Sequence, residues 1–288
     1  MSLDHLDPRI ADLASRPKDE RIAYILADKY VPYGLAEEII DKAYWILRQE
    51  RTQRPKCLLL FADSGCGKSM ILDEINRRHG GSQNPREVPV VSIKLSGSSD
   101  VRMLFIRILR ELDVPFSSGD RKDALYDQAI QALRAYGTKV IIIDELHNLL
   151  LAKRLVNESM VVIRDLANTP LSLICAGTRA ARSCVNADEQ LKHRFRCHQL
   201  KRWGATKDAR EFFATLESRL PLLEPSNLSS AAVATFLINK TQGHVETMVT
   251  VIRESGKTAL LNNKEAITPE IIEEVVARVM AEKYEAIQ

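Results

Sequence analysis

The segment CLLLFADSGCGKS, residues 57–69, joins an apolar run to a turn that contains glycines and ends in Lys-Ser. A helical pattern follows it, so the local order is strand, turn and helix. Such a turn can wrap backbone N–H groups around a phosphate, because Gly65 and Gly67 can adopt backbone angles that other residues avoid. Lys68 can then neutralise phosphate oxygens and Ser69 can hold Mg²⁺. The pattern predicts a site for ATP and Mg²⁺.

The usual form of this turn begins with glycine, where this chain has Ala62. Alanine is tolerable there if the position requires a close approach and not a positive φ. The alternative is an accidental glycine turn before a helix. The nucleotide contacts that we expect are Ala62, Asp63, Ser64, Gly65, Cys66, Gly67, Lys68, Ser69, Met70 and, from later in the chain, Asp144.

A second apolar run, in KVIIIDELHN at residues 139–148, ends in two carboxylates. Ligand chemistry gathers at the carboxyl edge of a parallel sheet. Asp144 is expected to hold Mg²⁺ with Ser69, and Glu145 to orient or deprotonate the attacking water. Alone, acidic residues here often open a loop or cap a helix; with the phosphate loop upstream they predict hydrolysis. For His147 we expect a structural or hydrogen-bonding role and not direct catalysis.

Short β-branched runs separated by helical patterns predict the parallel α/β sheet that positions these side chains. The expected strands are Cys57–Phe61, Val88–Leu95, Lys139–Ile143, Leu171–Ala176 and Cys197–Leu200. From Thr206 the β-runs stop, and the expected helices are Thr206–Arg219, Ser229–Lys240, His244–Asn262 and Pro269–Tyr284. These patterns predict a helical segment at 1–54, an α/β nucleotide-binding core at 55–204 and an all-α lid with a tail at 205–288. The last helix is expected to pack within the lid; the alternative is a partner-binding tail.

Composition narrows the possible classes of protein further. The 288 residues are 45% hydrophobic, and 41 Lys and Arg against 38 Asp and Glu leave a net charge of +3. Such a small net charge means that any nucleic-acid contact must be a local patch. Five cysteines form no CxxC pair, which argues against a zinc site or disulfide framework. Neither a signal sequence nor a membrane span is visible, so we expect a cytoplasmic protein.

Three strings carry a family resemblance: DELHN at 144–148, LSLICAGT at 171–178 and LKHRF at 191–195. Together with residues 20–22 and the helical stretch 35–51, they resemble the AAA+ transposition ATPases of the TniB and TnsC type, over about residues 15–265. The resemblance implies an AAA+ core with a five-stranded parallel sheet, followed by a small all-α lid.

The same resemblance assigns roles to individual residues. Thr178 takes the sensor-1 position, in contact with the γ-phosphate or the attacking water; a simple strand-ending threonine is the alternative. Arg194 corresponds to the arginine finger that one subunit extends into its neighbour's site, where a guanidinium can spread over developing charge. Arg196 is a second candidate for that role, and a surface ion pair is the plain alternative. Glu246 stands where many AAA+ proteins have the sensor-2 arginine, which puts that function in doubt, although Arg253 lies on the same predicted helix.

The implied function is an ATPase that regulates DNA transposition. By resemblance it forms a homo-oligomeric ring or filament on duplex DNA and recruits a transposase, and sometimes a TniQ-type target-selection protein, with hydrolysis driving disassembly. Expected contacts with the DNA backbone, independent of base sequence, are Lys94, Ser98, Arg102, Arg121 and Lys122. The alternatives are a helicase loader or replication initiator, a nucleotide-gated signalling scaffold that does not bind DNA, and a metabolic P-loop kinase.

Overall fold

The computed structural model describes residues 3–49, 55–97, 100–117, 119–150 and 156–285. The chain divides into two compact units. One contains residues 38–201 and the other combines residues 1–37 with residues 202–288. In the described ranges, no helix is long and apolar enough to cross a membrane.

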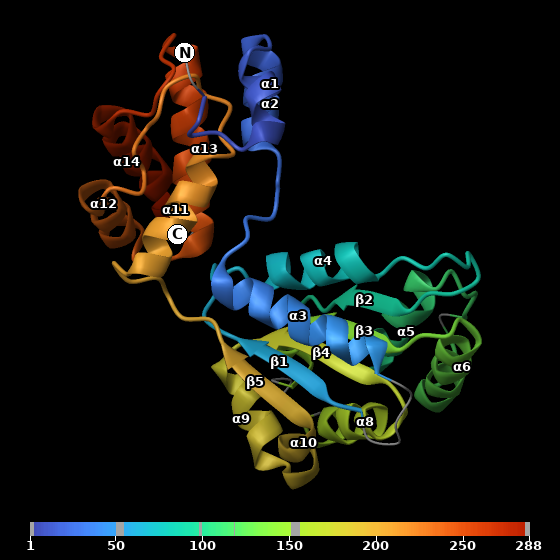
Figure 1. Ribbon diagram of the computed structural model, residues 1–288. Coiled ribbons are helices and arrows are strands. Elements are labelled where there is room, and N and C mark those ends of the chain that lie inside the picture. Colours follow the sequence, from blue (N-terminus) through green and yellow to red (C-terminus); the bar gives the residue numbers. More distant parts are fainter. Residues whose placement is uncertain (1–2, 50–54, 98–99, 118, 151–155, 286–288) are drawn as a thin grey trace. The chain divides into compact units, whose positions relative to one another are not determined.

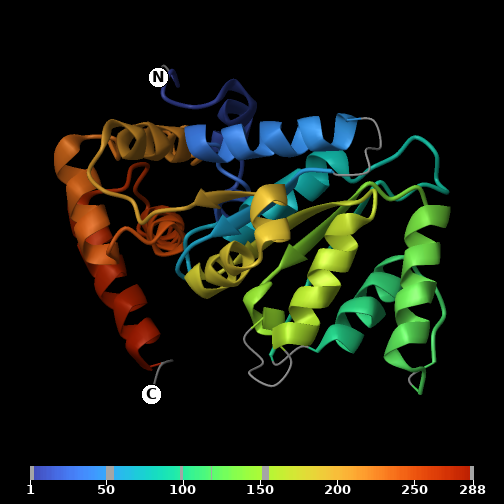
Figure 2. The same cartoon turned by 90° about the horizontal axis from the view of Figure 1, so that it is seen from below.

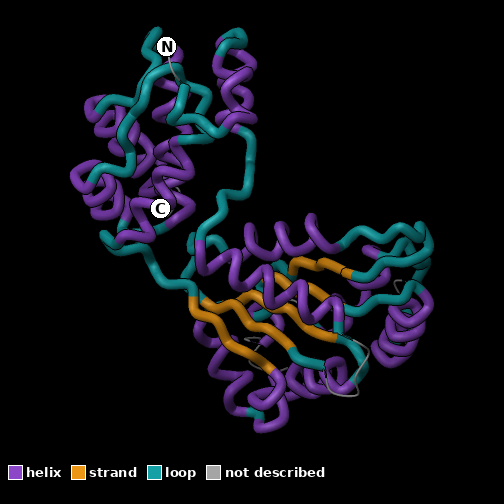
Figure 3. The backbone as a smooth tube through the Cα atoms, in the orientation of Figure 1, coloured by secondary structure: helices purple, strands orange, loops and turns teal. Residues whose placement is uncertain are grey.

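Five strands form a parallel sheet in the first unit (Figure 3). They are β1 (Cys57–Phe61), β2 (Val90–Lys94), β3 (Val140–Asp144), β4 (Ser172–Gly177) and β5 (Phe195–Gln199), in the order β2-β3-β4-β1-β5. Every residue of β1, β3 and β4 is buried, as expected for a parallel sheet that is covered on both faces. The predicted five-stranded parallel sheet is confirmed, and each observed strand overlaps its predicted run.

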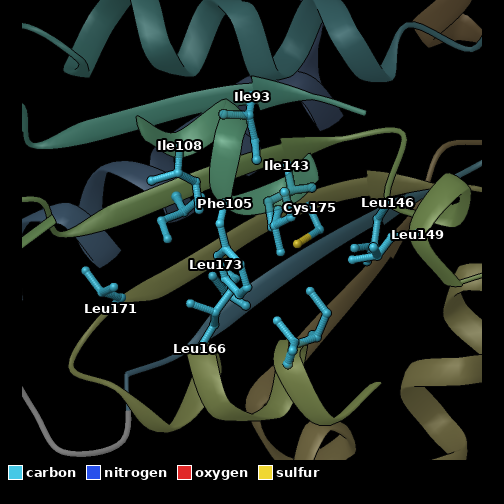
Figure 4. Packing of buried hydrophobic residues seen from close by; sticks show 14 of the residues in the cluster. Ile93, Phe105, Ile108, Ile143, Leu146, Leu149, Leu166, Leu171, Leu173 and Cys175 are labelled. Carbon is cyan, nitrogen blue, oxygen red and sulfur yellow. The ribbon is translucent and has the colours of Figure 1, made fainter. Parts of the chain in front are cut away.

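Helices cover both faces of this sheet (Figures 1 and 2). On one face lie α3 (Gly34–Arg48) and α4 (Lys68–His79); the other face carries α5 (Val101–Glu111), α6 (Lys122–Ala135), α8 (Val156–Asn168), α9 (Arg179–Ala187) and α10 (Glu189–Arg194). The short α7 (His147–Leu150) follows β3. Figure 4 shows the packing beneath the second group of helices, where the labelled side chains are Ile93, Phe105, Ile108, Ile143, Leu146, Leu149, Leu166, Leu171, Leu173 and Cys175.

The second unit is helical. It contains α1 (Pro8–Ala14), α2 (Lys18–Leu26), α11 (Lys207–Glu217), α12 (Ala231–Thr241), α13 (Val245–Leu261) and α14 (Pro269–Glu285), and the last four match the helices expected after Thr206. The N-terminal segment shares their core, because Ile25 is buried in the same apolar cluster as the C-terminal helices. The buried Arg21 side chain donates to the Pro221 carbonyl at 2.8 Å and pairs with the Glu265 carboxylate.

The turn between α12 and α13 requires glycine at position 243. Gly243 has φ 68, and a Cβ there would lie 2.2 Å from the Trp203 carbonyl oxygen. We predict that Gly243→Ala lowers the free energy of unfolding of this unit by about 2–4 kcal/mol, since both the left-handed backbone and the clash must be accommodated. Urea unfolding followed by circular dichroism measures this. Gly34→Ala is the matched control, because a Cβ there meets nothing within 4 Å; equal effects would refute the prediction.

Candidate nucleotide site at the carboxyl edge of the sheet

The loop from β1 to α4 has the backbone geometry of a phosphate cradle. Gly65 has φ 72, and Gly67, the residue preceding α4, has φ 83. Both values lie in the left-handed region that glycine adopts without a steric penalty. Residues other than glycine would resist this turn, which leads directly into the first turn of α4. The backbone N–H groups at the start of a helix have no partner within the helix, so this arrangement fits the binding of a phosphate at a helix N-terminus.

Lys68 lies inside this loop. Its side chain is buried, and Nζ donates to the carbonyl oxygens of Ala62 at 3.3 Å and Asp63 at 2.9 Å. Both of these acceptors are neutral carbonyls, so they do not balance the charge of the ammonium group, which is placed to attract an anion. Ala62 itself is buried and its N–H donates to the Gly177 carbonyl at 3.2 Å, so this position is set by contact with β4 and not by a positive φ.

One hydrogen bond joins the phosphate loop to the acidic strand end. Ser69 Oγ donates to Asp144 Oδ2 at 2.7 Å. Asp144 is buried at the last position of β3, and its other oxygen, Oδ1, accepts the Glu145 N–H at 2.8 Å. A hydroxyl and a carboxylate are oxygen ligands of the kind that Mg²⁺ prefers. The two predicted metal ligands are therefore adjacent in the fold, although they are far apart in the sequence.

Glu145 follows Asp144 in an unusual backbone conformation, with φ 58. A residue other than glycine in the left-handed region carries a strain of about 1–3 kcal/mol, which persists only when its surroundings impose it. Leu146 and Leu149 supply that constraint, because both are fully buried in the core beneath the turn (Figure 4). The strained turn thus begins directly after Asp144, which accepts the Glu145 N–H at the carboxyl edge of the sheet.

Thr178 follows β4 at the same edge. Among the described residues its Oγ1 is buried without a hydrogen-bond partner, and this hydroxyl makes no capping bond although the residue precedes α9. A buried unpaired hydroxyl is costly, so such atoms usually indicate a ligand or water that completes the bond. The residues present therefore fit a bound nucleotide and its metal ion.

Further charged residues gather at this edge that sequence reasoning did not select for it. Nε of Arg179 lies 3.6 Å from Oδ1 of Asp63 in the phosphate loop. Burial and the neighbouring Asp144 carboxylate raise the pKa of Asp73 on α4, while Lys94 opposes the rise. Lys94, expected to contact DNA, is the register partner of Asp144. The signal available for Arg179 was its position two residues after the end of a parallel strand.

Arg194 lies at the opposite edge of the sheet. It directly precedes Phe195, which is the register partner of Cys57 at the first position of β1. Its guanidinium donates to the Ala167 carbonyl and, at 2.7 Å, to Asn168 Oδ1 at the end of α8. A five-residue strand spans roughly 15 Å, so Arg194 and the phosphate loop of its own subunit are at separate edges. The other candidate, Arg196, is exposed within β5.

Among the expected DNA contacts, Lys94 ends β2, whereas Arg102, Arg121 and Lys122 lie around the starts of α5 and α6. Arg102 Nε donates to the Asp120 carbonyl at 3.2 Å, which brings Arg102 beside Arg121 in the chain fold. Arg121 is exposed, whereas Lys122 pairs with Glu158 at 2.6 Å. Ser98 lies outside the described residues. The structure therefore places four of the five expected DNA contacts. One of them, Lys122, is already engaged in an ion pair with Glu158.

The two sensor-2 candidates lie on α13. Glu246 is exposed in the first turn of this helix. Arg253 donates to Asp28 Oδ1 at 2.8 Å and to the Lys29 carbonyl at 3.2 Å within the same helical unit. Arg253 therefore has a structural role that accounts for it without a nucleotide.

Comparison with known families identifies the chain. The model of the bacterial TniB protein family matches residues 21–205. The chain belongs to the TniB family. TniB proteins are AAA+ ATPases associated with transposition, as the resemblance in the three strings implied. Among curated protein sequences, none matches this TniB chain.

Solved structures show the same fold. Cdc6p from Pyrobaculum aerophilum is 16% identical, with a TM-score of 0.65 over 88% of this chain and 70% of that chain. The Aeropyrum pernix ORC1 protein in complex with DNA is 18% identical, with a TM-score of 0.65 over 90% and 69%. Domain III of the replication initiation protein DnaA from Thermotoga maritima is 12% identical, with a TM-score of 0.55 over 95% and 98%. At these identities the likeness concerns fold alone, and it confirms the predicted AAA+ core with C-terminal helices.

The unpaired hydroxyl of Thr178 leads to a prediction with two readouts. Thr178→Val keeps the shape and removes the hydroxyl, so the free energy of unfolding should stay within about 0.5 kcal/mol or rise. ATP turnover should fall about 10-fold or more, because a polar contact to the reacting groups is lost. Urea unfolding and a phosphate-release assay measure the two effects. Parallel losses of stability and turnover would instead mark Thr178 as a structural residue.

Proposed function

We propose that this TniB protein binds ATP and Mg²⁺, assembles on duplex DNA without sequence specificity, and recruits or activates a transposase, with hydrolysis driving disassembly. The observation that carries the proposal is the meeting of Lys68, Ser69, Asp144 and Glu145 at one edge of the sheet while Arg194 lies at the other. An oligomer in which the two edges face each other would complete each site with a neighbour's guanidinium.

Each group at the carboxyl edge has a distinct task in this proposal. Lys68 and the loop N–H groups bind the phosphates, and Ser69 and Asp144 would hold the metal ion. When bound, Mg²⁺ supplies positive charge that balances the charge developing on the phosphate oxygens. Glu145 takes a proton from the attacking water, and Thr178 donates to the reacting phosphate or to that water. Each task follows from the chemistry of a side chain already at this edge.

Trans action by Arg194 predicts complementation between inactive variants. Glu145→Gln and Arg194→Ala should each reduce turnover at least about 100-fold, because one lacks the base and the other the guanidinium. A one-to-one mixture should regain turnover, since about a quarter of random head-to-tail contacts pair an intact Glu145 with an intact Arg194. Phosphate release from mixed subunits on duplex DNA measures this. A mixture no more active than its components would contradict trans action by Arg194.

The DNA part of the proposal rests on the charged residues around the starts of α5 and α6. Charge contacts to phosphates release counterions, so the double variant Arg102→Ala with Arg121→Ala should lower the slope of log affinity against log salt by roughly 2, equally for unrelated sequences. Fluorescence anisotropy with two unrelated duplexes and ATP measures the slope. Arg134→Ala, an exposed residue near the other end of α6, is the matched control. An unchanged slope in the double variant would place the DNA elsewhere.

A further inference from the structure

Glu145 and His147 form a pair within the turn that ends β3. His147 Nε2 lies 3.2 Å from Glu145 Oε2, with 19% and 28% of the two side chains exposed. Water screens a partly covered contact of this kind less than it screens a surface ion pair. The pair involves the carboxylate to which the proposed function assigns the attacking water.

The ring of His147 has one favourable neutral tautomer in this position. Within the described part of the chain, Nδ1 is buried and has no hydrogen-bond partner. A proton on Nε2 lies within hydrogen-bond distance of Glu145 Oε2, whereas a proton on Nδ1 would meet no acceptor among the described residues and would leave the Nε2 lone pair facing a carboxylate. The ring is therefore placed to act as a donor toward Glu145 through Nε2.

The backbone on both sides of the pair is fixed. The Leu146 N–H donates to the Ala176 carbonyl of β4 at 2.8 Å, and the Asn148 N–H donates to the Glu145 carbonyl at 2.9 Å. The Asn148 side chain donates to the Leu95 carbonyl at 3.1 Å. These bonds tie the turn to the strand on each side of β3, so the sheet fixes the backbone positions from which the Glu145 and His147 side chains extend.

We propose that His147 is the positioning residue of Glu145, an inference that rests on the proposed function. The Nε2–H of His147 holds Oε2, which leaves Oε1 to accept the proton as the water oxygen bonds to the γ-phosphorus and the bond to the leaving oxygen breaks. A base that is itself oriented by a third group is the arrangement found in many hydrolytic sites. His147 keeps its own proton throughout and never contacts the substrate.

The test compares variants of the full chain on duplex DNA. His147→Leu removes the donor, and His147→Gln restores an amide donor at similar reach. We expect His147→Leu to lower kcat about 10-fold, while the Kd for a fluorescent ATP analogue stays within about twofold and His147→Gln recovers most of the rate. A solely structural role would not separate Leu from Gln in this way. If His147→Leu does not fold, His147→Asn replaces it, because its shorter amide cannot reach Oε2.

A double-mutant cycle separates action through Glu145 from other effects. In the Glu145→Gln background, adding His147→Leu should change single-turnover hydrolysis less than about twofold, since the residue it positions is already neutral. An equal loss in both backgrounds, or a native rate in His147→Leu, would overturn the inference alone. If Glu145→Gln itself retains native turnover, the proposed role of Glu145 fails and the inference falls with it.

Discussion

The hydrogen bond between Ser69 and Asp144 depends on strand order more than on either residue. Ser69 lies at the start of α4, after β1, and Asp144 ends β3, with β4 between these strands in the sheet. The serine can reach the carboxylate because α4 begins directly after the loop at the end of β1 and packs across β4, β3 and β2. A parallel sheet makes this possible by bringing every carboxyl end to one edge. The rest of the site is assembled around that crossing.

The same sheet places Arg194 and the phosphate loop of one subunit at opposite edges. Gly65 to Ser69 follow the end of β1, whereas Arg194 precedes the start of β5. The register of these two neighbouring strands therefore keeps the arginine away from the phosphate loop of its own chain. Its bonds to the end of α8 preserve that placement without a nucleotide. Such a division is what the proposed trans action of Arg194 requires, because each site would then need an arginine from a neighbouring subunit.

The sheet and the phosphate loop could be predicted from the sequence because their signals are local. Apolar runs such as residues 57–61 bury themselves on both faces, and the glycines at 65 and 67 are needed by backbone geometry within a few residues. The contact of Arg179 with Asp63 and the inclusion of Arg21 in the helical unit join residues far apart in the chain. No periodicity encodes such pairs, since they depend on which strands become neighbours. The roles of Glu145, Thr178 and Arg194 stay predictions.

Two features at the carboxyl edge of the sheet each lower the stability of the fold. Glu145 holds a left-handed backbone, and in the described ranges Thr178 keeps a buried hydroxyl unpaired. Either feature alone would lower the stability of a sheet that is otherwise well packed. Both residues lie where the predicted substrate would bind. They follow β3 and β4, whose residues are all buried, and this packing can offset the loss of stability. The described chain carries such features elsewhere as well, for example at Asn227 and Ser255. At this edge they directly follow two neighbouring strands, β3 and β4, beside the proposed nucleotide site.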